Sequence, residues 1–168
     1  VSGVCFSDVG NKVYCVDKDK KKIDSLNKGI IPIYEPGLEE ILKKNLKQNR
    51  LIFTTDLEKA VKNSDIIFIC VGTPTKKNSN SADLKYVFKV AHELKKIISK
   101  YKIIITKSTV PVTTGDEIEK ILITLKNKNL VDIVSNPEFL REGEAIRDFI
   151  YPDRVIIGTD SKKANRIL

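Results

Sequence analysis

The sequence contains no methionine and no tryptophan, and it has only one histidine and three cysteines among 168 residues. Cys5, Cys15 and Cys70 lie in apolar segments without C-x-x-C spacing and without a histidine nearby, so we interpret them as buried, inert thiols. His92 falls in a long polar segment with helical spacing, which favours an exposed helix residue over a catalytic one. We therefore predict no metal site.

Long apolar runs are also missing. No stretch approaches the roughly 18 apolar residues that a transmembrane helix needs, and no signal peptide is recognisable. With 41% hydrophobic and 31% charged residues, the chain has the composition of a globular domain with a substantial core. We expect a cytoplasmic protein that does not bind membranes. Because the chain starts inside one apolar segment and stops in a helix-like one, we also expect it to be an internal piece of a longer protein.

The net charge of +8 raises the question of a nucleic-acid partner. Only five of the thirty basic residues are arginines, and the lysines are scattered over several predicted helix faces. Surfaces that read bases favour arginine and interleaved aromatic residues, and neither is clustered here. We expect no nucleic-acid partner, although the charge is compatible with a ligand that carries phosphate.

The segment Ile66 to Val71 consists of consecutive apolar residues, most of them β-branched. A short run of this kind is typical of a strand buried on both faces, as in a parallel sheet covered by helices. Gly72, Thr73 and Pro74 then end the strand. Because ligands of open α/β sheets bind outside the carboxyl ends of the strands, the polar residues after this strand are candidate site residues.

The rest of the chain alternates between strand and helix signals. We predict strands at 12–16, 51–54, 66–71, 103–106, 131–134 and 155–158, and helices at 1–9, 20–27, 38–47, 57–62, 84–99, 114–126, 144–149 and 162–168. Asp56 and Asp83 are predicted helix caps, and the polar loop 75–82 is predicted to be mobile. The alternation implies a parallel sheet with right-handed crossovers. The predicted fold class is therefore α/β, a doubly wound, mostly parallel sheet of the Rossmann type.

One part of such a fold is not recognisable in the sequence. Gly3 and Gly10 do not have the G-x-G-x-x-G spacing of a phosphate-binding turn. We therefore expect the first strand and the Gly-rich turn to precede Val1.

Asp17 directly follows the predicted strand 12–16. An acidic residue at the end of the second strand commonly binds the ribose hydroxyls of a dinucleotide, and it repels a 2′-phosphate, which favours NAD over NADP. Asp17 could equally be the N-cap of the next helix. The lysines at 18 and 20–22 weaken the argument against NADP, because a nearby lysine could accept a phosphate.

Three predicted strands end in polar loops that contain proline, at 72–74, 108–111 and 136–138. Because carboxyl ends of parallel strands meet at one edge of a sheet, these loops should form a continuous polar rim on which a ligand can bind. Glu138, Arg141 and Glu142 add charge to that rim. The alternative is a pair of solvated acids with a surface ion pair, which contributes little energetically.

Five motifs follow one another along nearly the whole chain. They are Pro32 to Leu38 (PIYEPGL), Val71 to Pro74 (VGTP), Lys107 to Val112 (KSTVPV), Asn136 to Gly143 (NPEFLREG) and Pro152 to Val155 (PDRV). Together they resemble the UDP-glucose/GDP-mannose dehydrogenase family, and they are most similar to its members that act on UDP-glucose. GDP-mannose and UDP-N-acetylhexosamines are the alternative substrates within the family. A non-catalytic nucleotide-binding module is the alternative outside it.

The resemblance implies an activity and a set of roles. UDP-glucose would be oxidised to UDP-glucuronate in two hydride transfers with two NAD. Asp17 and Lys22 would hold the adenosine end of NAD, while Thr73, Thr109 and Glu142 would line its path toward the nicotinamide. The substrate segment would consist of Glu138, Phe139, Leu140, Arg141 and Glu142. Glu138 and Thr109 would also help to activate the water that releases the product from a covalent thioester.

The resemblance also implies that residues 1–168 are an incomplete NAD-binding domain, inactive alone. The nucleophilic cysteine, the central helix and the substrate domain would lie beyond Leu168, and the parent enzyme would be a homodimer built through the central helix. Thr114 stands where relatives usually have glycine, in a predicted loop, so we expect little effect from it.

Overall fold

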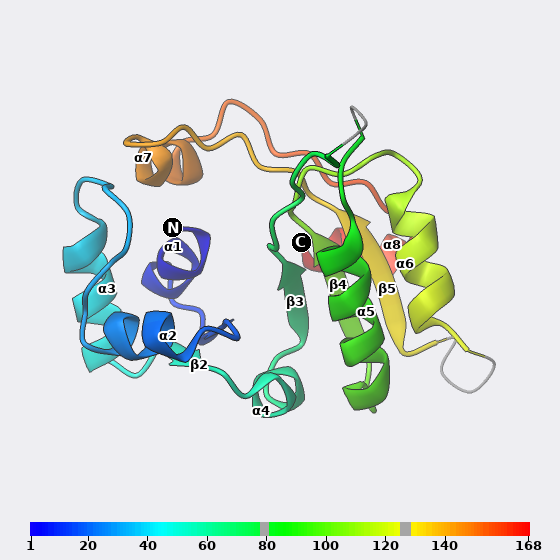
Figure 1. The fold of residues 1–168 in the computed structure, drawn as a ribbon, viewed down its shortest axis with the longest axis horizontal. Helices are drawn as coiled ribbons and strands as arrows, with labels where there is room; N and C mark the ends of the chain where they lie inside the picture. The colour runs from blue at the N-terminus through cyan, green and yellow to red at the C-terminus, as the bar shows by residue number, and fades with distance from the viewer. Residues whose placement is uncertain (78–80, 125–128) are drawn as a thin grey trace. The chain divides into compact units, whose positions relative to one another are not determined.

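The computed structural model describes residues 1–77, 81–124 and 129–168, which form two compact units of parallel strands and helices (Figure 1). The first unit comprises Val1–Ser64 and Phe139–Arg154, and the second comprises Asp65–Glu138 and Val155–Leu168. Each unit therefore contains two separate stretches of the chain.

The first unit contains a two-stranded parallel sheet. Its elements are α1 (Ser2–Asp8), β1 (Val13–Val16), α2 (Lys20–Asn27), α3 (Leu38–Lys47), β2 (Leu51–Thr54), α4 (Leu57–Lys62) and α7 (Ala145–Ile150). In the sheet, Val13 lies opposite Leu51. The core combines buried apolar side chains of α1, α2, α3 and β2, and Ile146 of α7 packs against it.

Two contacts fix α1 within this unit. Phe6 and Phe149 meet edge to face with their ring centroids 4.9 Å apart, which joins α1 to α7. Gly3 faces β1 so closely that a Cβ placed on it would lie 2.5 Å from Cys15 Sγ. Glycine at this position therefore leaves room for the Cys15 side chain between α1 and β1.

The second unit contains a three-stranded parallel sheet in the order β3-β4-β5. Its elements are β3 (Ile66–Ile69), α5 (Lys85–Ile97), β4 (Lys102–Thr106), α6 (Thr114–Leu122), β5 (Val131–Ser135) and α8 (Lys162–Ile167). All residues of the central strand β4 are buried. Ala164 of α8 packs with Ile103, Ile105 and Val134, while α5 and α6 lie side by side on the other face (Figure 1). Helices on both faces explain why β3 and the middle of β4 are continuously apolar.

A polar cluster ties α8 to this sheet. The hydroxyls of Tyr101 and Ser161 both donate to Asp132 Oδ2, and Ser161 Oγ in turn accepts from the Ala164 amide at the start of α8. Burial and the Asp132 carboxylate raise the pKa of Tyr101 to about 12, so its hydroxyl remains a donor at neutral pH.

These parallel sheets with covering helices confirm the predicted doubly wound α/β class. The prediction placed all strands in one sheet, whereas the described strands form two. In the ordinary order 3-2-1-4-5-6, the first strand separates the second strand from the fourth. β1 and β2 correspond in pairing to strands 2 and 3, and β3, β4 and β5 to strands 4, 5 and 6. No counterpart of strand 1 occurs within the described ranges.

The prediction of a strand at 155–158 was wrong. Only Gly158 pairs, in an isolated antiparallel bridge with Ser135. Val155 and Ile156 are 64% and 43% exposed, so their β-branched side chains do not reflect burial in a sheet. β3 also ends at Ile69 rather than Val71, because the Ile69 carbonyl accepts from the amides of residues 107 and 108, beyond the end of β4.

Other predictions were settled residue by residue. Asp56 caps α4 as predicted, by accepting from the Lys59 amide. The N-cap of α5 is Leu84 and not the predicted Asp83, although Asp83 accepts from the Lys85 amide at the start of that helix. Thr114 is the buried first residue of α6, which confirms the predicted start of that helix and corrects the expectation that Thr114 lies in a loop. Cys5 is buried as predicted, but Cys70 is exposed, because it follows the end of β3 instead of lying inside a strand.

Two predictions fall partly on residues outside the description. The loop 75–82 includes residues 78–80, and its described ends are paired, with the Lys76 amide donating to the Ser81 carbonyl at 3.0 Å. The helix predicted over 114–126 ends at Leu122, and residues 125–128 lie outside the described ranges. Among the described helices, none is long and apolar enough to cross a bilayer.

Candidate cofactor and substrate site

Asp17 lies at the carboxyl end of β1, in the first unit. Its Oδ1 accepts from the Asp19 amide at 3.0 Å, and its Oδ2 accepts from Lys22 Nζ at 2.7 Å. The hydrogen bond from the Asp19 amide has the largest effect and that from Lys22 the next largest, and together they hold the pKa of the Asp17 carboxyl below its usual range. The side chain is 32% exposed, so a charged carboxylate with spare lone pairs faces solvent beyond the end of the sheet.

The structure excludes one of the two interpretations of Asp17, the helix cap. The N-cap of α2 is Asp19, whose Oδ1 accepts from the Lys22 amide at 3.2 Å. Asp17 therefore does not cap α2. A short, ionised acceptor directly after a parallel strand fits the hydroxyls of an adenosine ribose, so these residues fit the adenosine end of NAD.

The loops after β3 and β4 meet in the second unit. Thr73 Oγ1 donates to the Thr109 carbonyl at 3.0 Å, and Ser108 Oγ donates to the Val71 carbonyl at 2.7 Å. The side chain of Thr109 is exposed. The two threonines named by the sequence thus belong to one hydrogen-bonded edge of the second unit.

The loop after β5 joins the same edge. Lys107 Nζ contacts Asn136 Oδ1 at 3.4 Å, and Asn136 Nδ2 donates to the Ile156 carbonyl at 2.8 Å. Glu138 follows two residues later and is exposed. The polar rim predicted from three strand ends therefore exists in the second unit, and it places a carboxylate close in sequence to a lysine–asparagine pair.

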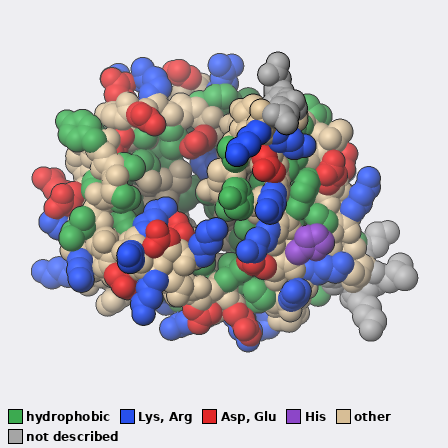
Figure 2. Space-filling view, in the orientation of Figure 1, with side chains coloured by type: hydrophobic (Ala, Val, Ile, Leu, Met, Phe, Trp, Pro, Cys, Tyr) green, Lys and Arg blue, Asp and Glu red, His purple; other side chains and the backbone are tan. Residues whose placement is uncertain are grey.

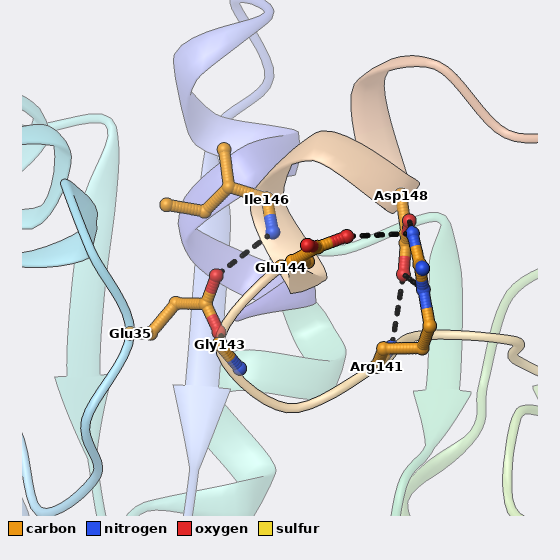
Figure 3. Close-up of polar contacts among 6 residues, drawn as sticks. All are labelled: Glu35, Arg141, Gly143, Glu144, Ile146 and Asp148. Carbon is orange, nitrogen blue, oxygen red and sulfur yellow. Dashed lines mark hydrogen bonds and ion pairs between the residues drawn. The ribbon is translucent and has the colours of Figure 1, made fainter.

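The segment after Glu138 belongs to the first unit. The Arg141 guanidinium contacts both oxygens of Asp148, with Nε to Oδ2 at 3.0 Å and Nη2 to Oδ1 at 2.7 Å, and Nη2 also lies 2.7 Å from Glu144 Oε2 (Figure 3). The ion pair expected at Arg141 exists, but with these acids and not with its sequence neighbours. Hydrogen bonds from Arg141 lower the pKa of Asp148 to about 2, and Asp148 raises the pKa of Arg141 above its usual range.

A second carboxylate, that of Glu35, also holds the segment after Glu138. Glu35 was not among the residues predicted from the sequence to have a role. Its side chain is only 6% exposed. Oε2 accepts from the Gly143 amide at 2.9 Å and Oε1 accepts from the Ile146 amide at 3.2 Å (Figure 3). Residues 35 and 143 are 108 positions apart, so no local spacing could reveal the contact. The only signal was that Glu35 stands inside one of the five motifs.

Three further predicted residues, Phe139, Leu140 and Glu142, belong to the same segment of the first unit. Glu142 is exposed, Leu140 is half-buried, and Phe139 is 52% exposed. The Arg154 guanidinium carbon lies 5.4 Å from the centroid of the Phe139 ring, which links the fourth and fifth motifs. The predicted site residues therefore divide between the units as follows: Asp17, Lys22, Phe139, Leu140, Arg141 and Glu142 in the first, and Thr73, Thr109 and Glu138 in the second.

The charged side chains form neither a basic stripe on the face drawn in Figure 2 nor, within the described ranges, a metal site. On the face drawn in Figure 2, lysine and arginine side chains are interspersed with acidic ones and do not gather in one stripe. Across the ranges that the structure describes, no three His, Cys, Asp or Glu side chains are arranged to hold a metal ion.

The Asp148 carboxylate should give the protein a stability contribution that depends on pH. Its pKa of about 2 in the folded protein lies below the value of about 3.9 for an unfolded chain. The contribution is therefore complete above about pH 4 and is lost as the pH falls toward about 2. We expect Asp148→Asn to lower the Tm at neutral pH, and the difference from wild type to shrink across that window. Asp24→Asn, at an exposed position of α2, is the control. If the Tm of Asp148→Asn lay below that of wild type by the same amount from neutral pH down to about pH 2, the pH-dependent contribution would not come from Asp148.

Parallel sheets with an ionised acid after β1 and hydroxyl-bearing loops after β3 and β4 define a nucleotide-binding domain of the Rossmann type. The chain belongs to the UDP-glucose/GDP-mannose dehydrogenase family, because residues 1–168 match the model of that family's NAD-binding domain. This confirms the resemblance found in the sequence, and with it NAD as the cofactor that this domain of the family binds.

Individual relatives agree with the family. The chain is 52% identical over 160 residues to a UDP-glucose 6-dehydrogenase of Rhizobium meliloti (strain 1021), covering 95% of this chain and 37% of the relative. It is 49% identical over 169 residues to UDP-glucose 6-dehydrogenase TuaD of Bacillus subtilis (strain 168), covering 100% and 36%. The chain thus spans little more than a third of the length of these relatives.

A solved structure shows the same fold. A ternary complex of GDP-mannose dehydrogenase from Pseudomonas aeruginosa superimposes with a TM-score of 0.92 at 38% identity, over 99% of this chain and 39% of that one. A UDP-glucose dehydrogenase from the archaeon Pyrobaculum islandicum gives a TM-score of 0.91 at 36% identity, also over 99% and 39%.

Proposed function

We propose that the full-length protein is a UDP-glucose 6-dehydrogenase, which oxidises UDP-glucose to UDP-glucuronate with two NAD, and that residues 1–168 supply its NAD-binding part. The supporting observation is the identity of 52% and 49%, over nearly the whole chain, to proteins that carry that name. The two solved structures do not separate the substrates, because the GDP-mannose dehydrogenase is 38% identical to the chain and the UDP-glucose dehydrogenase is 36% identical. The proposal includes a cytoplasmic homodimer that provides a precursor for polysaccharide synthesis.

In the first unit, Asp17 and Lys22 have complementary roles in this proposal. Asp17 accepts hydrogen bonds from the adenosine ribose hydroxyls through lone pairs that its two protein donors leave free. Lys22 keeps that carboxylate ionised and oriented from 2.7 Å. NAD, when bound, supplies the hydride acceptor, while these residues decide where the dinucleotide lies and which form of it is accepted.

In the second unit, the loops after β3, β4 and β5 provide the groups for the chemistry. The hydrogen bond from Thr73 to the Thr109 carbonyl fixes the backbone that carries the exposed Thr109 hydroxyl. Glu138 acts as the general base that takes a proton from water when the thioester is hydrolysed, with Thr109 orienting that water. The resemblance assigns the thiol of the thioester to a cysteine outside residues 1–168.

The segment from Glu138 to Glu142 contacts the sugar nucleotide in this proposal. Phe139 and Leu140 supply apolar contacts, and Glu142 extends toward both the substrate and the nicotinamide end of the cofactor. Arg141 contributes mainly by holding the segment, because its guanidinium is already paired with Asp148 and Glu144. The exposure of Phe139 and Glu142 supports contact with a ligand.

The proposal is tested by assaying the full-length protein with UDP-glucose, GDP-mannose and UDP-N-acetylmannosamine in separate reactions with NAD. NADH is followed by its absorbance, and the product is identified by mass spectrometry. We expect two NADH for each UDP-glucose consumed and UDP-glucuronate as the product. Preferential oxidation of another nucleotide sugar would replace the proposed substrate, and no NADH with any of them would overturn the proposed function.

A further inference from the structure

We infer that Glu35 is a positioning residue that fixes the turn carrying Glu142, and thereby sets the rate of the reaction without touching a ligand. The kinetic part of this inference rests on the proposed function. The structural part, that the Glu35 carboxylate clamps residues 141–146, stands on contacts within the first unit alone.

The clamp uses both oxygens of one buried carboxylate. Oε2 accepts from the Gly143 amide at 2.9 Å and Oε1 accepts from the Ile146 amide at 3.2 Å. The Glu35 backbone is itself anchored, because its carbonyl accepts from the amide of Leu38, which is buried at the start of α3. The loop before α3 therefore holds a segment more than 100 positions further along the chain.

The two amides need such an acceptor. Ile146 lies in the first turn of α7, where backbone amides have no acceptor within the helix. The α7 N-cap residue, Glu144, forms no side-chain capping bond within the described part of the chain. Gly143 adopts φ +82°, the left-handed conformation of a tight turn. Glu35 thus replaces a local cap and fixes the turn with one side chain.

A second carboxylate anchors the residue on the other side of Glu142. The Arg141 amide donates to Asp148 Oδ2 at 3.0 Å, in addition to the contacts of its guanidinium. The residues on both sides of Glu142 therefore donate their backbone amides to carboxylates. The Arg141 amide bonds Asp148, and the Gly143 amide bonds Glu35. The Glu142 side chain remains exposed. This arrangement orients one reactive side chain by fixing the peptide groups around it.

Only a carboxylate of this length fits the two donors. Glutamine keeps the volume but offers one acceptor oxygen, so its NH₂ group would face one of the two amides. Aspartate keeps both oxygens but lacks one methylene. Glu35→Gln should therefore break one of the two bonds, leave the other, and let the turn move relative to the core of the first unit.

The first measurement is hydrogen exchange of the full-length protein without ligands, read by mass spectrometry on peptides that cover 139–150. We expect faster exchange of this segment in Glu35→Gln and in Glu35→Asp, with unchanged exchange in α2 and β2. The control is Asn45→Ala, because Asn45 is buried in the same unit but bonds Asp8, Arg50 and the Ile41 carbonyl instead. It should lower the Tm without faster exchange at 139–150. Wild-type exchange at 139–150 in both Glu35 variants would overturn the clamp.

The second measurement is a double-mutant cycle on kcat/KM between Glu35→Gln and Glu142→Gln. Displacing a contact residue by about 1 Å costs up to about 10²-fold, so we expect Glu35→Gln to lower kcat/KM about 10- to 100-fold. If Glu35 acts through Glu142, the double variant should be little slower than Glu142→Gln alone. Asn45→Ala should instead combine with Glu142→Gln by simple multiplication.

Simple multiplication of the Glu35→Gln and Glu142→Gln effects would show that Glu35 stabilises the fold only, and would overturn the positioning role. If the wild-type protein oxidised no nucleotide sugar, the proposed function would be wrong, and with it the kinetic part of the inference. The exchange experiment would still decide whether Glu35 clamps the turn.

Discussion

Replacing Glu138 with glutamine in the full-length protein should lower kcat by about 10²–10⁴-fold, the usual contribution of general acid–base assistance. Glutamine preserves the shape and most hydrogen bonding of the side chain but cannot take a proton from water. Hydrolysis of the thioester follows the hydride transfers, so its loss should affect kcat and leave the substrate KM less changed. Glu138 lies at the polar rim next to the Lys107–Asn136 pair and is exposed, so a water molecule can reach it.

The distinguishing signature of this variant is an accumulating intermediate. Rapid mixing of Glu138→Gln with UDP-glucose and NAD should give a burst of NADH followed by slow turnover. Intact-protein mass spectrometry after quenching should show the added mass of the nucleotide sugar. Glu117→Gln, at an exposed position of α6, is the matched control and should behave as wild type. Near-normal turnover without an adduct would move the water-activating role to Thr109 or to residues outside 1–168.

Replacing Asp17 with alanine should narrow the preference for NAD over NADP by about 10- to 100-fold in kcat/KM, since a hydrogen bond to a charged group contributes about 1.5–3 kcal/mol. Use of NAD should fall because the ribose hydroxyls lose their acceptor. Use of NADP should rise because the carboxylate no longer repels the 2′-phosphate. The variant also releases Lys22, whose ammonium lies 2.7 Å from Asp17 in the wild type and would then be free to pair with that phosphate.

The control for this experiment is Asp19→Ala. Asp19 caps α2 and contacts Asp17 only through its own backbone amide, which alanine retains. Its loss should lower the Tm by removing the cap, while the ratio of kcat/KM for NAD and NADP stays close to that of wild type. Equal use of NAD and NADP by the wild type, or an equal shift of that ratio in both variants, would show that Asp17 does not choose the cofactor.

Elements that depend on neighbouring residues were predictable from the sequence. The bounds of α2, α3, α4 and β2 agree with the prediction, because apolar spacing, Gly29 and the Asp56 cap all act within one or two turns. The polar rim of the second unit was also predictable, since it follows from the rule that parallel strands share their carboxyl edge.

Features that depend on distant partners were not predictable. The segment 155–158 has the composition of a strand, yet only Gly158 pairs, because composition does not determine which edge a segment reaches. Asp17 was the only cap of α2 predicted from the sequence, whereas the backbone path assigns the cap to Asp19. The Glu35 contacts were invisible for the same reason, because a buried carboxylate gives no periodic signal and its partners are backbone amides.

The division of the first unit into two stretches of the chain has a consequence for how the protein is synthesised. A ribosome makes residues 1–64 first, but Gly143 and Ile146 follow only after the whole of 65–138. During that interval the Glu35 carboxylate lacks its two amide donors, and the core that Ile146 covers stays open. The second unit is also completed late, because its strands β3 to β5 are made by residue 135 but α8, which packs against them, follows only after the whole of the first unit. A nascent chain halted before residue 143 would therefore carry an unfinished first unit, exposed to proteases and chaperones.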